Sequence, residues 1–267
     1  MKIPNREVKV KTFCTVLLTG VLFGGVSFEA AAQGYAGDHA TLEPIMLIDK
    51  PTAGMLKKGG YYLGANFYQR GGLLTSIAVG LFDRFSFGIS YGGTDIIGPN
   101  TIAMNPLPGV MAKLRIIEEG TTMPAVALGF DSQGKEPRVE SLDRYTIKSP
   151  GFYAVASKNY ALLGNFSIHG GINYSLERGD GDEDVNIFVG AEKSMGDILS
   201  VIAEYDFAVN DNHYRAIGRG RGYFNLGFRL SAGEGLVIGF DLKNVTQNQQ
   251  HVKIANRVLQ IDFIGSF

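Results

Sequence analysis

Apolar and polar residues alternate along most of the chain after residue 58. In the segment RFSFGISYGG, residues 84–93, aromatic or branched side chains occupy positions 85, 87, 89 and 91, and serine or glycine stands between them. The segments 185–194 and 223–230 follow the same rule, with Phe188 as the one exception. Successive side chains of a strand point to opposite faces, so this period of two predicts strands with one apolar face and one polar face.

About twelve segments show this pattern, and no stretch after residue 58 shows the 3.6-residue period of an amphipathic helix. The predicted strands lie near residues 59–69, 72–82, 85–93, 109–118, 122–131, 151–161, 165–177, 185–194, 198–209, 222–231, 235–244 and 257–267.

The connections between these segments alternate in length. Short links near residues 83–84, 118–120, 163–164, 195–197 and 232–234 alternate with longer polar ones near 94–108, 132–150, 178–184, 210–221 and 245–256. The short link at Arg70 and Gly71 alone departs from this alternation. Bacterial outer-membrane barrels have an even number of strands, short periplasmic turns and long external loops. The sequence therefore predicts an all-β fold, an antiparallel transmembrane barrel of about twelve strands.

The polar face of these strands carries too many charges for an ordinary packed core. Burying unpaired charges in a soluble sandwich costs several kcal/mol each, whereas a barrel in lipid turns its apolar face outward and its polar face to the lumen. The alternation also predicts that substituting arginine destabilises the fold strongly at the lipid-facing residues Ile187 or Leu226. The same substitution should destabilise it much less at Asn186 or Asn225. The side chains predicted to face the lumen are Lys113, Arg115, His169, Glu177, Glu192, Glu204, Asp206, Arg229, Asp241, Lys243 and Asp262.

The first 32 residues have the three parts of a secretory signal peptide. Four basic residues precede an apolar run over 13–26, and small residues end at Ala32, where we predict cleavage. The only cysteine, Cys14, lies inside this leader, so the predicted mature chain has no thiol chemistry. The expected organisation is a signal peptide at 1–32, a periplasmic or lumenal segment at 33–58, and a barrel at 59–267.

The C-terminal strand ends on an aromatic residue. Phe263 and Phe267 fall on the predicted lipid-facing side, and a terminal aromatic of this kind resembles the signal that the outer-membrane assembly machinery reads. Together with the leader, it places the chain in the outer membrane of a Gram-negative bacterium. Outer-membrane lipid and the assembly machinery are therefore the first expected partners. A net charge of −1 argues against a nucleic-acid partner.

Two motifs offer chemistry, and each has a simpler interpretation. Asp180, Asp182 and Asp184 alternate in one loop as calcium ligands can, but the longer calcium-loop pattern is absent, which favours a solvated acidic loop. His169 has Ser167 and Ser175 on its own face, as a barrel hydrolase would require. That face points to the lumen rather than to lipid, which favours a hydrogen-bonded histidine. We expect no enzyme activity, no metal and no cofactor.

Three segments carry a family resemblance. KPTAGMLKKGGYYLGANFY (50–68), MPAVALGFDSQG (123–134) and GFYAVASKNY (151–160) resemble the YjbH-like outer-membrane proteins associated with exopolysaccharide production. The resemblance spans roughly residues 48–176 and implies a role in the production, passage or surface attachment of a polysaccharide, with its export proteins as partners. The family supplies no catalytic residues. Two alternatives remain open, a narrow solute channel and a barrel hydrolase that acts on lipid.

Overall fold

The computed structural model describes residues 34, 36–40, 42–250 and 256–267. The predicted signal peptide and its cleavage point at Ala32 lie outside the described residues. No helix in the described part of the chain is both long enough and apolar enough to cross a membrane.

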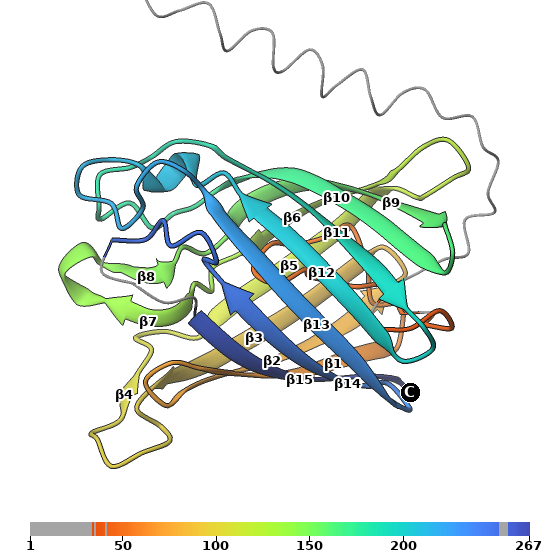
Figure 1. Ribbon diagram of the computed structural model, residues 1–267, viewed down its shortest axis with the longest axis horizontal. Coiled ribbons are helices and arrows are strands. Elements are labelled where there is room, and N and C mark those ends of the chain that lie inside the picture. Colours follow the sequence, from red (N-terminus) through yellow and green to blue (C-terminus); the bar gives the residue numbers. More distant parts are fainter. Residues whose placement is uncertain (1–33, 35, 41, 251–255) are drawn as a thin grey trace, which may run out of the picture.

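Twelve strands form one closed antiparallel barrel (Figure 1). Each strand pairs with the next along the ring, and β1 closes it by pairing with both β2 and β15, with Tyr61 opposite Val79 and Gly265. The prediction of a twelve-stranded barrel is confirmed. The barrel strands are β1 (Gly60–Tyr68), β2 (Gly72–Phe82), β3 (Phe85–Thr94), β5 (Gly109–Ile117), β6 (Ala125–Asp131), β9 (Gly151–Ala161), β10 (Asn165–Tyr174), β11 (Asn186–Met195), β12 (Leu199–Asp206), β13 (Tyr223–Gly233), β14 (Leu236–Lys243) and β15 (Asn256–Ser266).

The long loops gather at one end of the barrel and the short turns at the other, together with the C-terminus (Figure 1). The turn between β13 and β14 shows how the short end is made. Glu234 has a φ of 49° and Gly235 a φ of 83°. Two positive φ values in a two-residue link suit the right-handed twist of paired strands.

The long loops contain small elements that the sequence pattern does not predict. β4 (Ala103–Met104) adds to β3, and β7 (Lys135–Val139) pairs with β8 (Arg144–Ile147) in a separate hairpin. Two short 3-10 turns lie at Glu140–Leu142 and Val209–Asp211. These elements are too short to show a period, so alternation could not reveal them.

The outward face of the barrel is apolar all the way round. Side chains such as Ile89, Ile187 and Phe240 remain 41–49% exposed, and exposed apolar residues stand on every barrel strand except β12, where Leu199 and Val201 are half-buried. Soluble monomers rarely expose a continuous apolar surface of this extent. The surface of this chain is therefore suited to lipid, and the closed sheet leaves no unpaired edge in it.

The inward face is polar but also holds small apolar clusters. Phe188 is fully buried there and packs with Val155 and Tyr153 against Ala53 of the N-terminal segment. This contact explains why Phe188 breaks the alternation, since it faces a second layer of protein rather than water or lipid.

Candidate functional site

The lumen of the barrel is occupied by residues 42–58, which we call the plug. Its two limbs meet in a tight turn in which Leu47 N–H donates to the Lys50 carbonyl at 2.8 Å, and Met46 bridges to Pro51. The chain enters and leaves at the short-turn end, where Asp38 N–H donates to the Gly196 carbonyl at 2.8 Å. Of the segment 33–58, for which the sequence left two places open, residues 42–58 form this plug.

The tip of the plug is held by one carboxylate. Glu204 Oε2, on β12, accepts the backbone N–H groups of Ile48, Asp49 and Lys50 at 3.1, 2.9 and 2.9 Å. Glu204 is fully buried. A buried carboxylate loses its hydrogen bonds to water, and three N–H donors on a single oxygen replace them.

Charged side chains of the tip complete this contact. Lys50 Nζ lies 2.6 Å from Asp206 Oδ2, and Asp49 Oδ1 lies 2.7 Å from Lys243 Nζ. All four side chains are buried. Buried ion pairs of this kind are costly to break singly, because the remaining charge then has no partner.

The middle of the plug is held by cations of β5. Lys113 Nζ donates to the carbonyls of Ile45, Thr52 and Gly54 at 2.7, 3.0 and 3.1 Å. Two residues further along β5, Arg115 donates to the Ala53 carbonyl at 3.1 Å. Arg115 also pairs with Glu43 of the plug.

His169 belongs to the same set of contacts. Its Nδ1 lies 2.7 Å from Ser157 Oγ and its Nε2 2.9 Å from Ser167 Oγ, while Ser157 Oγ accepts the Ala53 N–H at 2.8 Å. Neither ring nitrogen contacts a carboxylate within the described ranges. Ser175 instead lies 3.4 Å from Ser149. The histidine therefore orders the wall beside the plug, and the serine–histidine–acid arrangement of a hydrolase is not assembled here.

The other predicted lumen residues pair within the interior. Arg229 Nη1 donates to Asp241 Oδ1 at 2.6 Å, and Tyr62 donates to Asp262 at 2.8 Å. Glu192 accepts the Ser200 hydroxyl at 2.6 Å. The structure buries the side chains of ten of the eleven predicted residues, namely Lys113, Arg115, His169, Glu192, Glu204, Asp206, Arg229, Asp241, Lys243 and Asp262.

Glu177 is the exception, and its assignment to a strand face was wrong. β10 ends at Tyr174, and Glu177 lies in the loop beyond it, where its carboxylate accepts the N–H groups of Tyr145 and Ser149 at 2.7 and 2.8 Å. It therefore ties the β7–β8 hairpin to the barrel rim. A polar loop residue that continues the alternation by chance cannot be told from a strand residue by pattern alone.

The loops at the long-loop end are joined by buried ion pairs. Arg144 of β8 lies 2.5 Å from Asp180 and 2.6 Å from Asp211, and Lys148 lies 2.9 Å from Asp180. Burial opposes ionisation of Asp180, but Lys148, the Asp182 N–H and Arg144 outweigh it and lower the pKa of the carboxyl below its ordinary value. Three loops are thereby tied into a lid over the lumen.

The acidic loop at residues 180–184 takes part in the contacts of the lid. Asp182 Oδ2 accepts the N–H groups of Asn212 and His213 at 2.8 and 3.1 Å, whereas Asp184 is exposed. The carboxylates of Asp180 and Asp182 thus serve different partners, and that of Asp184 is turned to solvent. Over the described residues, no group of three acidic, histidine or cysteine side chains is placed to hold a metal ion.

The lid and the plug meet at the plug tip. Lys135 of β7 donates to the Ile48 carbonyl at 2.6 Å and lies 3.4 Å from Asp49. Neighbouring Glu136 accepts from Asn256 at 2.7 Å. The hairpin thus reaches inward to the same turn that Glu204 holds from the wall.

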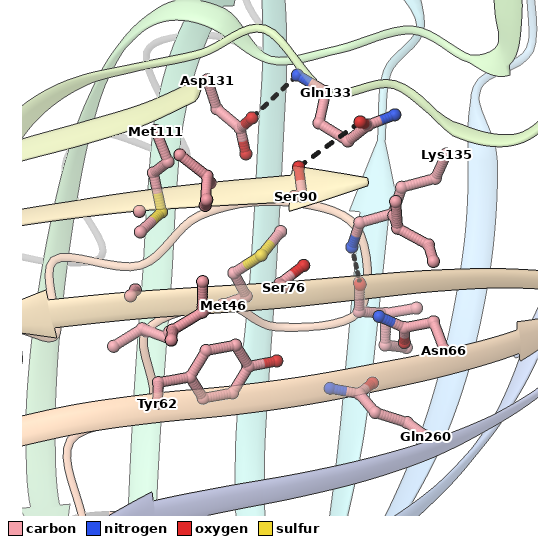
Figure 2. Close-up of a pocket in the computed structure, with 17 residues that line it drawn as sticks. Met46, Tyr62, Asn66, Ser76, Ser90, Met111, Asp131, Gln133, Lys135 and Gln260 are labelled. Carbon is pink, nitrogen blue, oxygen red and sulfur yellow. Dashed lines mark hydrogen bonds between the residues drawn. The ribbon is translucent and has the colours of Figure 1, made fainter. Parts of the chain in front are cut away.

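Several cavities border the plug, and two of them are lined in part by β5. One, of about 50 Å³, lies between the plug and strands β1, β2, β3 and β5, and Figure 2 shows Tyr62, Met46 and Met111 around it. The other, of about 150 Å³, lies at the short-turn end near Glu119 and Asn159. The smaller cavity has room for a few water molecules only.

Comparison with known proteins gives a loose structural likeness. No family model and no curated protein matches the sequence. The fold is similar to that of the KdgM porin, with a TM-score of 0.47 and 7% identity over 78% of this chain and 99% of that chain. It is also similar to the NanC porin, with a TM-score of 0.42 and 10% identity over 78% of this chain and 99% of that chain. A third similar structure is the translocator domain of the autotransporter NalP from Neisseria meningitidis, with a TM-score of 0.38 and 11% identity over 78% of this chain and 86% of that chain.

Proposed function

We propose that this protein is a non-enzymatic outer-membrane barrel whose lumen is closed by its own N-terminal segment, and that it serves as a surface scaffold in exopolysaccharide production. The observation that carries the proposal is the plug. Residues 43–54 form hydrogen bonds with side chains of β5, β9, β12, β13 and β14, so the barrel wall contacts the plug on several sides.

The outer-membrane location is supported by this chain's own features. The predicted leader directs export, the outward face is apolar, and the long loops and short turns lie at opposite ends. In this location Phe267, which is 95% exposed beyond β15, is free to be read by the assembly machinery. Its ring lies 5.0 Å from that of Tyr61 on the adjacent strand.

The polysaccharide role rests on the resemblance of residues 50–68, 123–134 and 151–160 to YjbH-like proteins. The first of these segments includes the returning limb of the plug and β1. The export proteins of a polysaccharide are therefore the proposed partners, and the external loops are the surface that they or the polymer would contact.

A narrow solute channel is the second candidate, and the two cavities favour it. They lie along the plug, so a small movement of the plug would join them. A scaffold does not require such spaces, although small water-filled gaps also occur in closed proteins.

We expect the refolded wild-type protein to be almost silent in planar lipid bilayers. The plug and the lid fill the lumen, and the described residues leave no open path of the kind found in large porins. Single-channel recording measures this directly. Steady, large conductance from the unmodified protein would overturn the scaffold and favour the channel.

A further inference from the structure

Lys113 is an unusual buried cation. Its side chain is 2% exposed, and its ammonium donates to three plug carbonyls. Within the described part of the chain, no carboxylate lies within ion-pair distance of it, whereas Arg115, Lys50 and Lys243 each have at least one. Its positive charge is therefore balanced by carbonyl dipoles alone at close range.

Lys113 also lies between the two cavities. On the inner face of β5 it follows Met111, which lines the smaller cavity, and precedes Arg115, which lines the larger one. Its carbonyl partners divide in the same way, since Ile45 lines the smaller cavity and Gly54 the larger. Lys113 itself lines neither cavity, so its ammonium and three hydrogen bonds belong to the protein that separates the two spaces.

We propose that solutes crossing this barrel pass along the inner face of β5, that Lys113 forms the constriction of this route, and that its charge selects small anions such as chloride. The proposal rests on the channel function, the second candidate above. An ion at the constriction is close to an ammonium with no carboxylate partner, so an anion is attracted and a cation is repelled.

The carboxylates along the route lie in its wider parts and are already engaged. In the larger cavity Glu43 and Glu118 pair with Arg115, and Glu119 pairs with Lys158. In the smaller one Asp131 accepts the Gln133 N–H at 2.9 Å, as Figure 2 shows. Lys135, at the external end of the smaller cavity, adds a second cation. The sign of the charge at the narrowest point of the route is therefore set by Lys113.

The test uses Lys113→Cys in the full chain, where the only other cysteine is Cys14 of the predicted leader. We expect this variant to conduct several-fold more than wild type in planar bilayers, because the ammonium and its three plug contacts are lost. An anionic methanethiosulfonate reagent should then make the current cation-selective, and a cationic one should restore anion selectivity, both read from the reversal potential in a salt gradient.

Ser200→Cys is the matched control. Ser200 is 1% exposed on the inner face of β12, lines neither cavity, and donates to Glu192. Neither reagent should change its current. If Lys113→Cys does not fold, as judged by heat-modifiable mobility, Lys113→Met tests the same route, because it removes the ammonium but keeps a side chain of similar length, and it should conduct more than wild type without anion preference.

Two results would overturn the route: a folded Lys113→Cys barrel as silent as wild type, or a conducting one whose reversal potential does not respond to either reagent. Both leave the plugged scaffold intact. Large conductance from wild type would instead overturn the scaffold, so the two failures are distinguishable.

Discussion

Replacing Glu204 with alanine is expected to destabilise the folded barrel by about 3–5 kcal/mol, the usual cost of removing one partner from a buried charge cluster. The substitution leaves the N–H groups of Ile48, Asp49 and Lys50 without their acceptor. It also removes a negative charge from a site where Lys50 stays buried. Reversible denaturant unfolding in lipid vesicles measures the change in free energy of unfolding.

The control for this substitution is Glu183→Ala. Glu183 is exposed in a long loop and lies 3.7 Å from Arg178, so its loss should cost at most about 1 kcal/mol. Similar costs for the two variants would mean that the wall does not hold the plug through Glu204.

Arginine at Leu226 is expected to cost about 2–4 kcal/mol, because this position lies within β13 on the apolar outer face, whereas Ile187 is only the second residue of β11. Leu163→Arg is the matched control. Leu163 is 92% exposed in the turn between β9 and β10, at the end of the barrel, where arginine should cost about 0–1 kcal/mol. Unfolding in lipid separates the two, and equal costs would contradict the lipid-facing assignment.

The companion prediction from sequence, that arginine is much milder at Asn186 or Asn225, is corrected by the structure. Asn186 donates to Asp206 at 2.7 Å, and Asn225 donates to Glu204 at 2.8 Å. Both side chains are buried under the plug or lid. A larger cation there has no room, so these positions should be as costly as the outer ones.

This error shows what alternation can and cannot predict. A period of two assigns each residue to the inside or the outside, and the closed ring of twelve strands follows from segment number and link length. It does not say what fills the inside. Whether Glu204 faces water or three backbone N–H groups depends on residues 48–50, about 155 positions away in sequence.

The lid was beyond sequence reasoning for a related reason. Arg144, Lys148 and Asp211 lie between barrel strands, where no period applies. Arg144 and Lys148 meet Asp180, and Arg144 meets Asp211, only because three strand ends are adjacent in the barrel. The acidic loop was visible as a carboxylate run, but its partners were not. Phe188 gave the one available hint of a second layer, since an apolar residue on a polar face needs something to pack against.

The position of the plug can be tested most directly by cross-linking. Ala53→Cys combined with Ser157→Cys places two thiols where the Ala53 N–H now lies 2.8 Å from Ser157 Oγ. Ala53→Cys with Ile168→Cys is the control, because Ile168 is on the outer face. After mild oxidation of the folded protein in membranes, a cross-link in the first pair alone is the predicted result, read as a mobility change of the denatured chain. No cross-link in the first pair, or equal cross-linking in both, would contradict a plug held inside the barrel.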